Sequence, residues 1–286
     1  MKNVEIFELL ENSKNFPKLT QDVSRIFDML KNTQGLHIDQ LVQEVARYDQ
    51  LSDLILNVFN TKQFYKRTAK IKDAVIYLGI DAVQNLLVFF LSKQLFSEIT
   101  TTNKHRKFKM THYWRHVLGT SAASYILSLR IKRLDKHKLF TYGLIHDIGI
   151  PLLDTCAPDL VDEIFENLMT GMHQLVAERS VLGGITHAEI GAWLCRKWNI
   201  RDDITDIVEF HHTPFLAKSD SDEVKLIYVA DVISTEYYEK LLGLNINHAI
   251  TSKIMDYFGL TDINKQDVTD ALISEVDRLG NFFTWV

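Results

Sequence analysis

Ionisable side chains stand inside an otherwise apolar stretch of this sequence. The run YGLIHDIGIPLL, residues 142–153, carries His146 and Asp147 among aliphatic residues. Burying such groups costs free energy unless each is hydrogen-bonded, ion-paired or bound to a metal. Because imidazole and carboxylate both bind divalent transition metals, the pair is a candidate metal site.

Two predicted helices bring another histidine beside this pair. Helical periodicity predicts one helix over 112–130 and a second over 136–149, with Asp135 as the N-cap of the second. His116 lies about 15 residues before the chain reversal and His146 about 12 residues after it. At a rise of ~1.5 Å per residue, the two histidines lie level with each other in an antiparallel helix pair.

Three further predicted helices complete the candidate set. The capping-box pattern of Thr186 and Glu189 puts His187 in a first helical turn, where the helix dipole disfavours the imidazolium and so favours the form that binds metal. The segment EFHHTP ends a helix at a histidine pair, and LIYVADVIS places a lone carboxylate in an apolar helix. The whole set is His116, His146, Asp147, His187, His211, His212 and Asp231. One or two divalent transition metal ions (Fe, Mn, Zn or Ni) would satisfy these side chains together.

Some of these residues also have an ordinary explanation when taken alone. The helix dipole favours histidines at a C-terminus, which would account for His211 and His212, and Asp231 could hydrogen-bond a neighbour. Seven such residues, mostly inside apolar helices, are harder to explain as unrelated core residues. The other histidines stand in polar or boundary contexts and are left out of the set: His37, His105, His112, His137, His173 and His248.

The rest of the chain is predicted to form helices that position this set. Apolar residues recur at helical spacing through the first hundred residues and the second half, and no segment alternates like a strand between hairpin turns. Further helices are predicted over 159–169, 172–181, 187–198, 202–212, 223–241 and, as a pair, 246–279. We predict an all-α fold, with an N-terminal helical subdomain over 1–105 packed on a histidine-bearing one over 106–242, and C-terminal helices with an apolar tail over 243–286.

The composition narrows the class of protein. The chain has 286 residues, 46% of them hydrophobic, so it can bury a sizeable core. A net charge of -5 argues against a protein that coats nucleic acid, and no apolar run approaches the ~20 residues that span a membrane. The N-terminus lacks the apolar run of a signal peptide, and the two cysteines are too few for a disulfide framework. We expect a cytoplasmic protein that binds neither nucleic acid nor membranes.

The ordered histidine and aspartate set resembles the HD superfamily of all-helical, metal-dependent phosphohydrolases, and more specifically its HDOD subfamily. The stretches YWRHVLGTSAA, YGLIHDIGIPLL, THAEIGAWLCRKWNI and EFHHTP are similar to segments typical of that subfamily. NFPKLTQDVSRIFDML, VARYDQLSDLILNVFNT and IKDAVIYLGIDAVQNLLV resemble its non-catalytic helical part. The resemblance covers the range 16–240.

This resemblance implies a metal site without implying turnover. HDOD domains are regarded mainly as bacterial signalling modules, whereas the related HD-GYP phosphodiesterases hydrolyse cyclic di-GMP with metals bound at matching positions. Those enzymes usually carry lysine where this chain has Ile150, and the G-Y-P signature is absent after EFHHTP. In an active enzyme of this kind, His146 and Asp147 would hold the metal-bound water.

Three functions remain open at this point. The first is a regulatory module that acts on a protein partner in trans, since no receiver, kinase or DNA-binding segment is evident in this sequence. The second is a metal-dependent phosphohydrolase that takes a nucleotide or phosphate ligand. The third is a helical scaffold with a vestigial site. We also predict that the tail residues Phe282, Phe283, Trp285 and Val286 pack on the chain's own helices or on a second copy in a homodimer.

Overall fold

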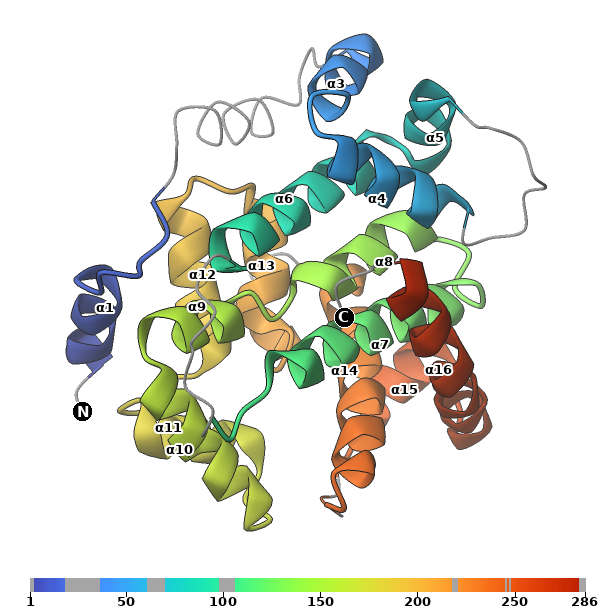
Figure 1. Ribbon diagram of the computed structural model, residues 1–286. Coiled ribbons are helices and arrows are strands. Elements are labelled where there is room, and N and C mark those ends of the chain that lie inside the picture. Colours follow the sequence, from blue (N-terminus) through green and yellow to red (C-terminus); the bar gives the residue numbers. More distant parts are fainter. Residues whose placement is uncertain are drawn as a thin grey trace.

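The computed structural model describes residues 3–18, 37–60, 70–97, 106–217, 221–244, 246 and 248–282. Within these ranges all regular structure is helical and no strand is present (Figure 1). The predicted all-α fold is therefore confirmed. The division into subdomains at 105 and 242 stays a prediction.

The N-terminal part supplies amphipathic helices, one of which packs away from the others. The helices are α1 (Asn3–Glu11), α3 (Ile38–Val45), α4 (Asp49–Asn60), α5 (Ile71–Leu78) and α6 (Ile80–Ser97). Helix α5 ends at Gly79, whose φ of +85° favours glycine. Helix α1 contacts α9, and its Phe7 lies 5.3 Å, between ring centroids, from Trp193 of α12.

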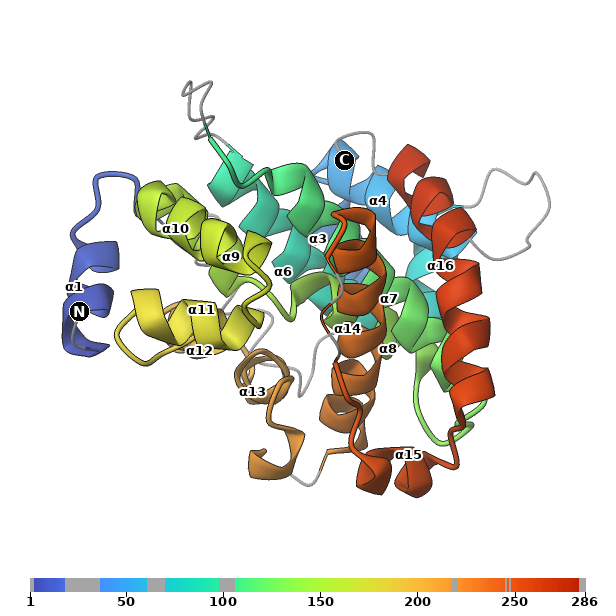
Figure 2. The same cartoon turned by 90° about the horizontal axis from the view of Figure 1, so that it is seen from below.

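The second half is built around one long helix. Its helices are α7 (Met110–Ser128), α8 (Lys136–Ile145), α9 (Gly149–Cys156), α10 (Pro158–Met169), α11 (Gln174–Val181), α12 (His187–Lys197), α13 (Asp202–Phe210), α14 (Asp222–Leu241), α15 (Ser252–Phe258) and α16 (Asp262–Phe282). Helix α7 packs against α8, α14 and α16. Figures 1 and 2 show α7 and α8 in the middle of the molecule, with α9–α12 on one side and α16 on the other.

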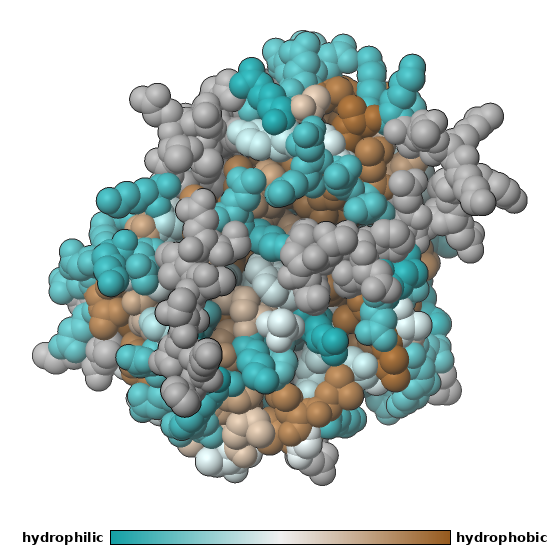
Figure 3. Space-filling view, viewed as in Figure 1, coloured by the Kyte–Doolittle hydropathy of each residue, from teal (hydrophilic) through white to brown (hydrophobic). Residues whose placement is uncertain are grey.

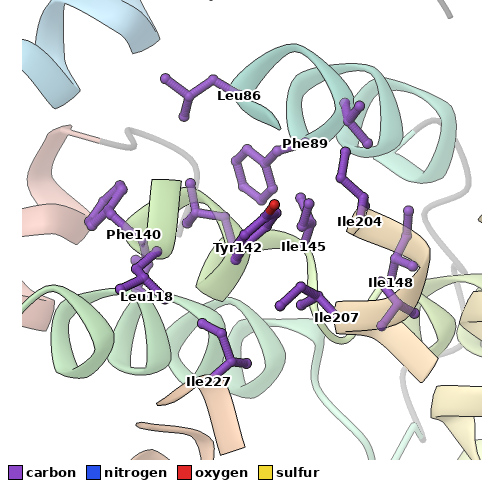
Figure 4. Close-up of a cluster of buried hydrophobic side chains, with 14 of the residues drawn as sticks. Leu86, Phe89, Leu118, Phe140, Tyr142, Ile145, Ile148, Ile204, Ile207 and Ile227 are labelled. Carbon is purple, nitrogen blue, oxygen red and sulfur yellow. The ribbon is translucent and has the colours of Figure 1, made fainter. Parts of the chain in front are cut away.

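The two halves share one apolar core. Figure 4 shows Leu86 and Phe89 of α6 above Tyr142 of α8, with Ile207 of α13 and Ile227 of α14 on the other side of α8. All five side chains are at most 3% exposed. Burial of this kind contributes about 1.5–3 kcal/mol for each large side chain, so α8 is held firmly between its neighbours.

The structure corrects one predicted helix. The helix predicted over 136–149 ends at Ile145, and a turn over 146–148 separates it from α9, which begins at Gly149. A Cβ at Gly149 would overlap the carbonyl oxygen of His187, so α9 must start where its backbone can lie directly against α12. The His146–Asp147 pair therefore lies in a turn between two helices.

Two other features concern the surface and the chain end. The face in Figure 3 carries mostly hydrophilic residues, with hydrophobic ones gathered in smaller patches. Among the described helices, none alone is long and apolar enough to cross a membrane; α5 and α6 satisfy the length and composition only as a pair, bent by 110°. The predicted packing of the C-terminal apolar tail concerns side chains outside the described residues, since those of 280–286 are not described.

Candidate metal centre

Helices α7 and α8 bring the first two candidate histidines together. Asp135 is the N-cap of α8, as predicted, and accepts two backbone N–H groups through its side chain. Where the helices cross, a Cβ on Gly143 would lie 2.6 Å from the Cα of Ser121, so glycine permits a close approach of the backbones. The Nε2 atoms of His116 and His146 are consequently 3.3 Å apart, which agrees with the level expected from the helix lengths.

Helix α12 places the next histidine against the turn that follows α8. The predicted capping box is present, and the Glu189 carboxylate accepts the backbone N–H of Thr186 at 2.8 Å. His187 begins the helix and is fully buried. Because Gly149 lets α9 touch the backbone of α12, the His187 ring lies beside Asp147.

The remaining candidates come from α13 and α14. Helix α13 ends at Phe210, and the histidine pair follows before a short 3₁₀ turn that begins at Pro214. His211 is fully buried, whereas the His212 side chain keeps 18% of its surface exposed. Asp231 lies in the middle of α14 and is 2% exposed. The structure thus brings all seven predicted residues to one place.

The seven side chains form two adjoining groups. The first consists of His116, His146 and Asp231, whose nitrogen and oxygen atoms lie within 4.8 Å of one another. His116 Nε2 is 3.1 Å from Asp231 Oδ1 and 3.3 Å from Asp147 Oδ2. His146 Nε2 is 3.6 Å and 3.4 Å from the same two oxygens.

The second group consists of Asp147, His187, His211 and His212. Asp147 Oδ1 lies 3.0 Å from His187 Nε2 and 3.2 Å from His211 Nε2. His187 Nε2 is in turn 3.2 Å from His211 Nε2 and 3.1 Å from His212 Nε2. Asp147 therefore turns Oδ2 toward the first group and Oδ1 toward the second, which is the position of a bridging carboxylate.

Hydrogen bonds at the outer nitrogens fix which atom of each ring faces the centre. His146 and His211 each direct Nδ1 at the backbone carbonyl three residues earlier, at 2.8 Å and 2.9 Å. His187 Nδ1 lies 2.7 Å and 2.8 Å from the two oxygens of Glu178. A carbonyl or an ionised carboxylate can only accept, so each Nδ1 carries a proton, and each ring presents an inward Nε2 lone pair once it is neutral.

The donor set fits metal ions. When both rings are neutral, His187 Nε2 and His211 Nε2 face each other at 3.2 Å as two acceptors, and either a proton on His187 or a metal ion between them removes the repulsion. Two ligand atoms about 2.1 Å from one ion lie about 3.0 Å apart at a right angle and about 3.4 Å apart at the tetrahedral angle. The contacts within both groups are close to this range. Asp147 Oδ1 is buried and accepts no hydrogen bond when His187 and His211 are neutral, so it too needs the partner that a metal would supply.

The electrostatics of the site also favour bound cations. Burial disfavours the ionised forms of Asp147 and Asp231, but the surrounding histidines hold the pKa of both carboxyls well below the usual 3.8. Burial likewise disfavours the imidazolium, yet Asp147 and Asp231 raise the pKa of His116 to about 9, and Glu178 and Asp147 raise the pKa of His187 well above 6.5. Protons therefore balance the carboxylates until metal replaces them.

One residue of the site was not predicted from the sequence. Glu178 of α11 is 2% exposed and also accepts the backbone N–H of His187 at 2.9 Å. It holds His187 in position, as carboxylates commonly do for metal-binding histidines. Its only signal in the sequence is an acidic residue within a helix, which is the usual sign of a solvent-exposed face.

The helical fold and the converged histidine–aspartate cluster define this chain as a protein of the HD class. The sequence model of the HDOD domain matches residues 16–214, and the chain belongs to the HDOD family. A curated relative, an uncharacterized protein of Treponema pallidum (strain Nichols), is 23% identical over 211 residues, which cover 69% of this chain and 38% of that protein. This chain therefore spans well under half the length of that relative.

Solved structures share the fold at low sequence identity. An HDOD domain protein of unknown function from Geobacter sulfurreducens has a TM-score of 0.70 and 19% identity, with 98% of this chain and 96% of that one covered. A Shewanella amazonensis SB2B protein, named "Putative phosphohydrolase", has a TM-score of 0.65 and 19% identity over 96% and 97% of the two chains. A Marinobacter aquaeolei VT8 protein, named "Putative signal transduction protein", has a TM-score of 0.70 and 19% identity over 98% and 65%.

Proposed function

We propose that this chain is a signal-transduction module of the HDOD family whose buried cluster holds two divalent transition metal ions. The observation that supports the metal site is the convergence of His187 Nε2 and His211 Nε2, 3.2 Å apart with both Nδ1 atoms already donating, so that loss of the proton from His187 leaves two inward lone pairs for a metal ion. His116, His146 and Asp231 would hold one ion, and His187, His211 and His212 the other. Asp147 would bridge them.

Bound ions would supply fixed positive charge that polarises an oxygen ligand and lowers the pKa of water beside it. The protein's own contribution is to hold the ligand set in place. Glu178 keeps the proton of His187 on Nδ1, and the backbone carbonyls do the same for His146 and His211. The buried surroundings exclude bulk water from all of the ligands except the edges of His116 and His212.

A regulatory role without phosphodiester turnover is supported by the wall of the site. Ile150 lines the cavity that His116 and Asp147 also line. An aliphatic side chain there donates neither a hydrogen bond nor charge to a phosphoryl oxygen. No lysine or arginine lines this cavity among the residues that the structure describes. We propose that the output is read by a protein partner.

Metal-dependent phosphohydrolysis is the second candidate. The observation that favours it is the completeness of the cluster, because all seven predicted side chains converge and none is displaced. A site retained only as a relic would not need the outer hydrogen bonds that hold three of its histidines in one tautomer.

Turnover assays on metal-loaded protein separate the two candidates. The substrates are cyclic di-GMP, the linear dinucleotide pGpG, and nucleoside mono- and triphosphates. We expect no multiple-turnover hydrolysis by the wild type, with the Ile150→Lys variant measured beside it to test the missing cation. Multiple-turnover hydrolysis by the wild type that is lost in Asp147→Asn would overturn the regulatory assignment.

A further inference from the structure

A small cavity lies beside the proposed metal centre and has a use of its own. It measures about 130 Å³ and lies between α7, α9, α10, α11 and α14. Its apolar walls include Leu153, Val161, Ile164, Phe165 and Leu168. We call this space the chamber. Its volume is close to the ~150 Å³ of an apolar protein cavity that takes up benzene.

Several residues that line the chamber carry an unpaired polar atom. Apart from Asp147, which belongs to the proposed metal centre, three of its lining residues carry a buried side-chain atom without a hydrogen-bond partner: His112 Nδ1, Tyr238 Oη and Glu239 Oε1. A buried polar atom left unpaired costs about 1–3 kcal/mol, so buried polar groups are normally satisfied. An apolar pocket with a few convergent polar atoms is the usual form of a small-molecule site.

Among these atoms, Oε1 of Glu239 is the most informative. The residue is 4% exposed, and its Oε2 lies 2.5 Å from His248 Nε2. That contact engages one carboxylate oxygen and leaves Oε1 without a partner, on a residue that lines the chamber. Tyr238 adds a hydroxyl that has no other partner. A ligand with a hydroxyl or amino group could donate a hydrogen bond to Glu239 Oε1. The same group could accept a hydrogen bond from the Tyr238 hydroxyl.

Among the described residues, the lining offers no strongly basic side chain that would bind a polyanion. Three carboxylate residues line the chamber, Asp147, Glu178 and Glu239, and no lysine or arginine does so within the described part of the chain. A cyclic dinucleotide carries two phosphates and is far larger than about 130 Å³.

We infer that the chamber binds a small neutral organic molecule with a compact apolar body, about the size of a benzene ring, and a hydroxyl or amino donor that bonds Glu239. This inference deepens the proposed function, on which it rests, because it names the chemical class of the signal that the module senses beside its metal ions. The apolar body occupies the space between Val161, Ile164 and Leu168. The donor end meets the unpaired carboxylate oxygen.

Ligand-observed NMR titrations with phenol and anisole test this inference. Phenol has the ring and the donor, and anisole replaces the donor hydrogen by a methyl group. We expect phenol to bind wild-type protein at least fivefold more tightly than anisole, both with metal and after chelation. Cyclic di-GMP should not displace it. Equal binding of the two probes, or displacement of phenol by cyclic di-GMP, would overturn the inference.

Two variants and a matched control locate the binding. Leu168→Trp fills the chamber and should weaken phenol binding at least tenfold, whereas Met169→Trp, at an adjacent residue that is 44% exposed, should leave it unchanged. Glu239→Gln keeps the shape of the side chain but presents an amide donor in place of the acceptor. The affinity for phenol should therefore fall to the affinity for anisole. If Leu168→Trp does not fold, Glu239→Gln decides the question. If phenol binds Glu239→Gln, or a folded Leu168→Trp, as tightly as it binds the wild type, the inference is contradicted.

Metal content, measured on the same samples by atomic spectrometry, keeps this inference separate from the proposed function. Phenol binding by protein that takes up no metal would refute the metal site and keep the chamber as a binding site. Stoichiometric metal without phenol binding would refute the chamber and keep the metal site. Binding that requires metal and is insensitive to Leu168→Trp means that phenol coordinates the ions directly, which also refutes the chamber.

Discussion

Replacing Glu178 by glutamine should weaken one of the two proposed metal positions. The carboxylate accepts from His187 Nδ1, from the His187 backbone N–H at 2.9 Å and from Gln174 Nε2 at 2.9 Å. A glutamine has one oxygen for these donors, and its amide group would face at least one of them donor to donor. The His187 ring must then turn, or move its proton to Nε2 and cease to be a ligand.

The size of this effect follows from the role of the carboxylate. Loss of a hydrogen-bond partner that orients a metal ligand lowers metal affinity about 10- to 100-fold, which corresponds to about 1.4–2.7 kcal/mol. The change should fall on the position formed by His187, His211 and His212. The position formed by His116, His146 and Asp231 should keep its affinity, because none of its ligands contacts Glu178.

Competition with a chromophoric chelator measures both affinities in one titration. Wild-type protein should release its ions in two steps, and Glu178→Gln should shift only one of them. Glu163→Gln, an exposed residue of α10, is the matched control and should leave both steps unchanged. Identical titrations for Glu178→Gln and wild type would refute the assigned role of this residue.

Three other changes test the packing around the site. Gly149→Ala places a methyl group against the carbonyl oxygen of His187 and should lower the free energy of unfolding by about 1–3 kcal/mol, measured in urea; an unchanged midpoint would contradict the close approach of α9 and α12. Tyr142→Phe removes a 2.6 Å hydrogen bond to the Asp203 carboxylate and should cost about 1.5–3 kcal/mol in the same assay, whereas a neutral result would mean that this bond contributes nothing. Burial lowers the pKa of Lys93 to about 7. Between pH 7 and 10.5 the folded protein therefore binds fewer protons than the unfolded protein, so the free energy of unfolding rises with pH in this range. Lys93→Met should therefore stabilise the protein most at or below pH 7 and progressively less toward pH 10.5, and a gain independent of pH would contradict the shift.

The sequence was sufficient to predict that the candidate residues lie together, because most of them are tied to a helix end or a helix length. His187 follows a capping box, and His116 and His146 lie level across an antiparallel pair whose turn is marked by Asp135. Both signals depend on residues that are close in the sequence, and both are present in the folded structure. The break at 146–148 was missed because apolar residues continue at helical spacing through it. Its cause is the contact of Gly149 with α12, which is a tertiary constraint.

The supporting residues could not be found in the same way. Glu178 lies on a short helix whose other polar residues are partly or fully exposed, and its burial depends on where α11 meets α12. His112 was set aside as a boundary histidine, yet it lines the chamber with Tyr238 and Glu239. These three come from α7 and α14, and only the packing of the two helices shows that they share a cavity.

Metal stoichiometry of the purified protein tests the central claim most directly. Wild type, Asp147→Ala and the control Asp202→Ala, an exposed residue at the start of α13, are loaded in turn with iron, manganese, zinc and nickel and measured by atomic spectrometry. With Asp147 as the bridge, we predict about two ions per chain in wild type and control and fewer than one in Asp147→Ala. Equal metal in all three proteins, or none in wild type with any of the four metals, would contradict the account.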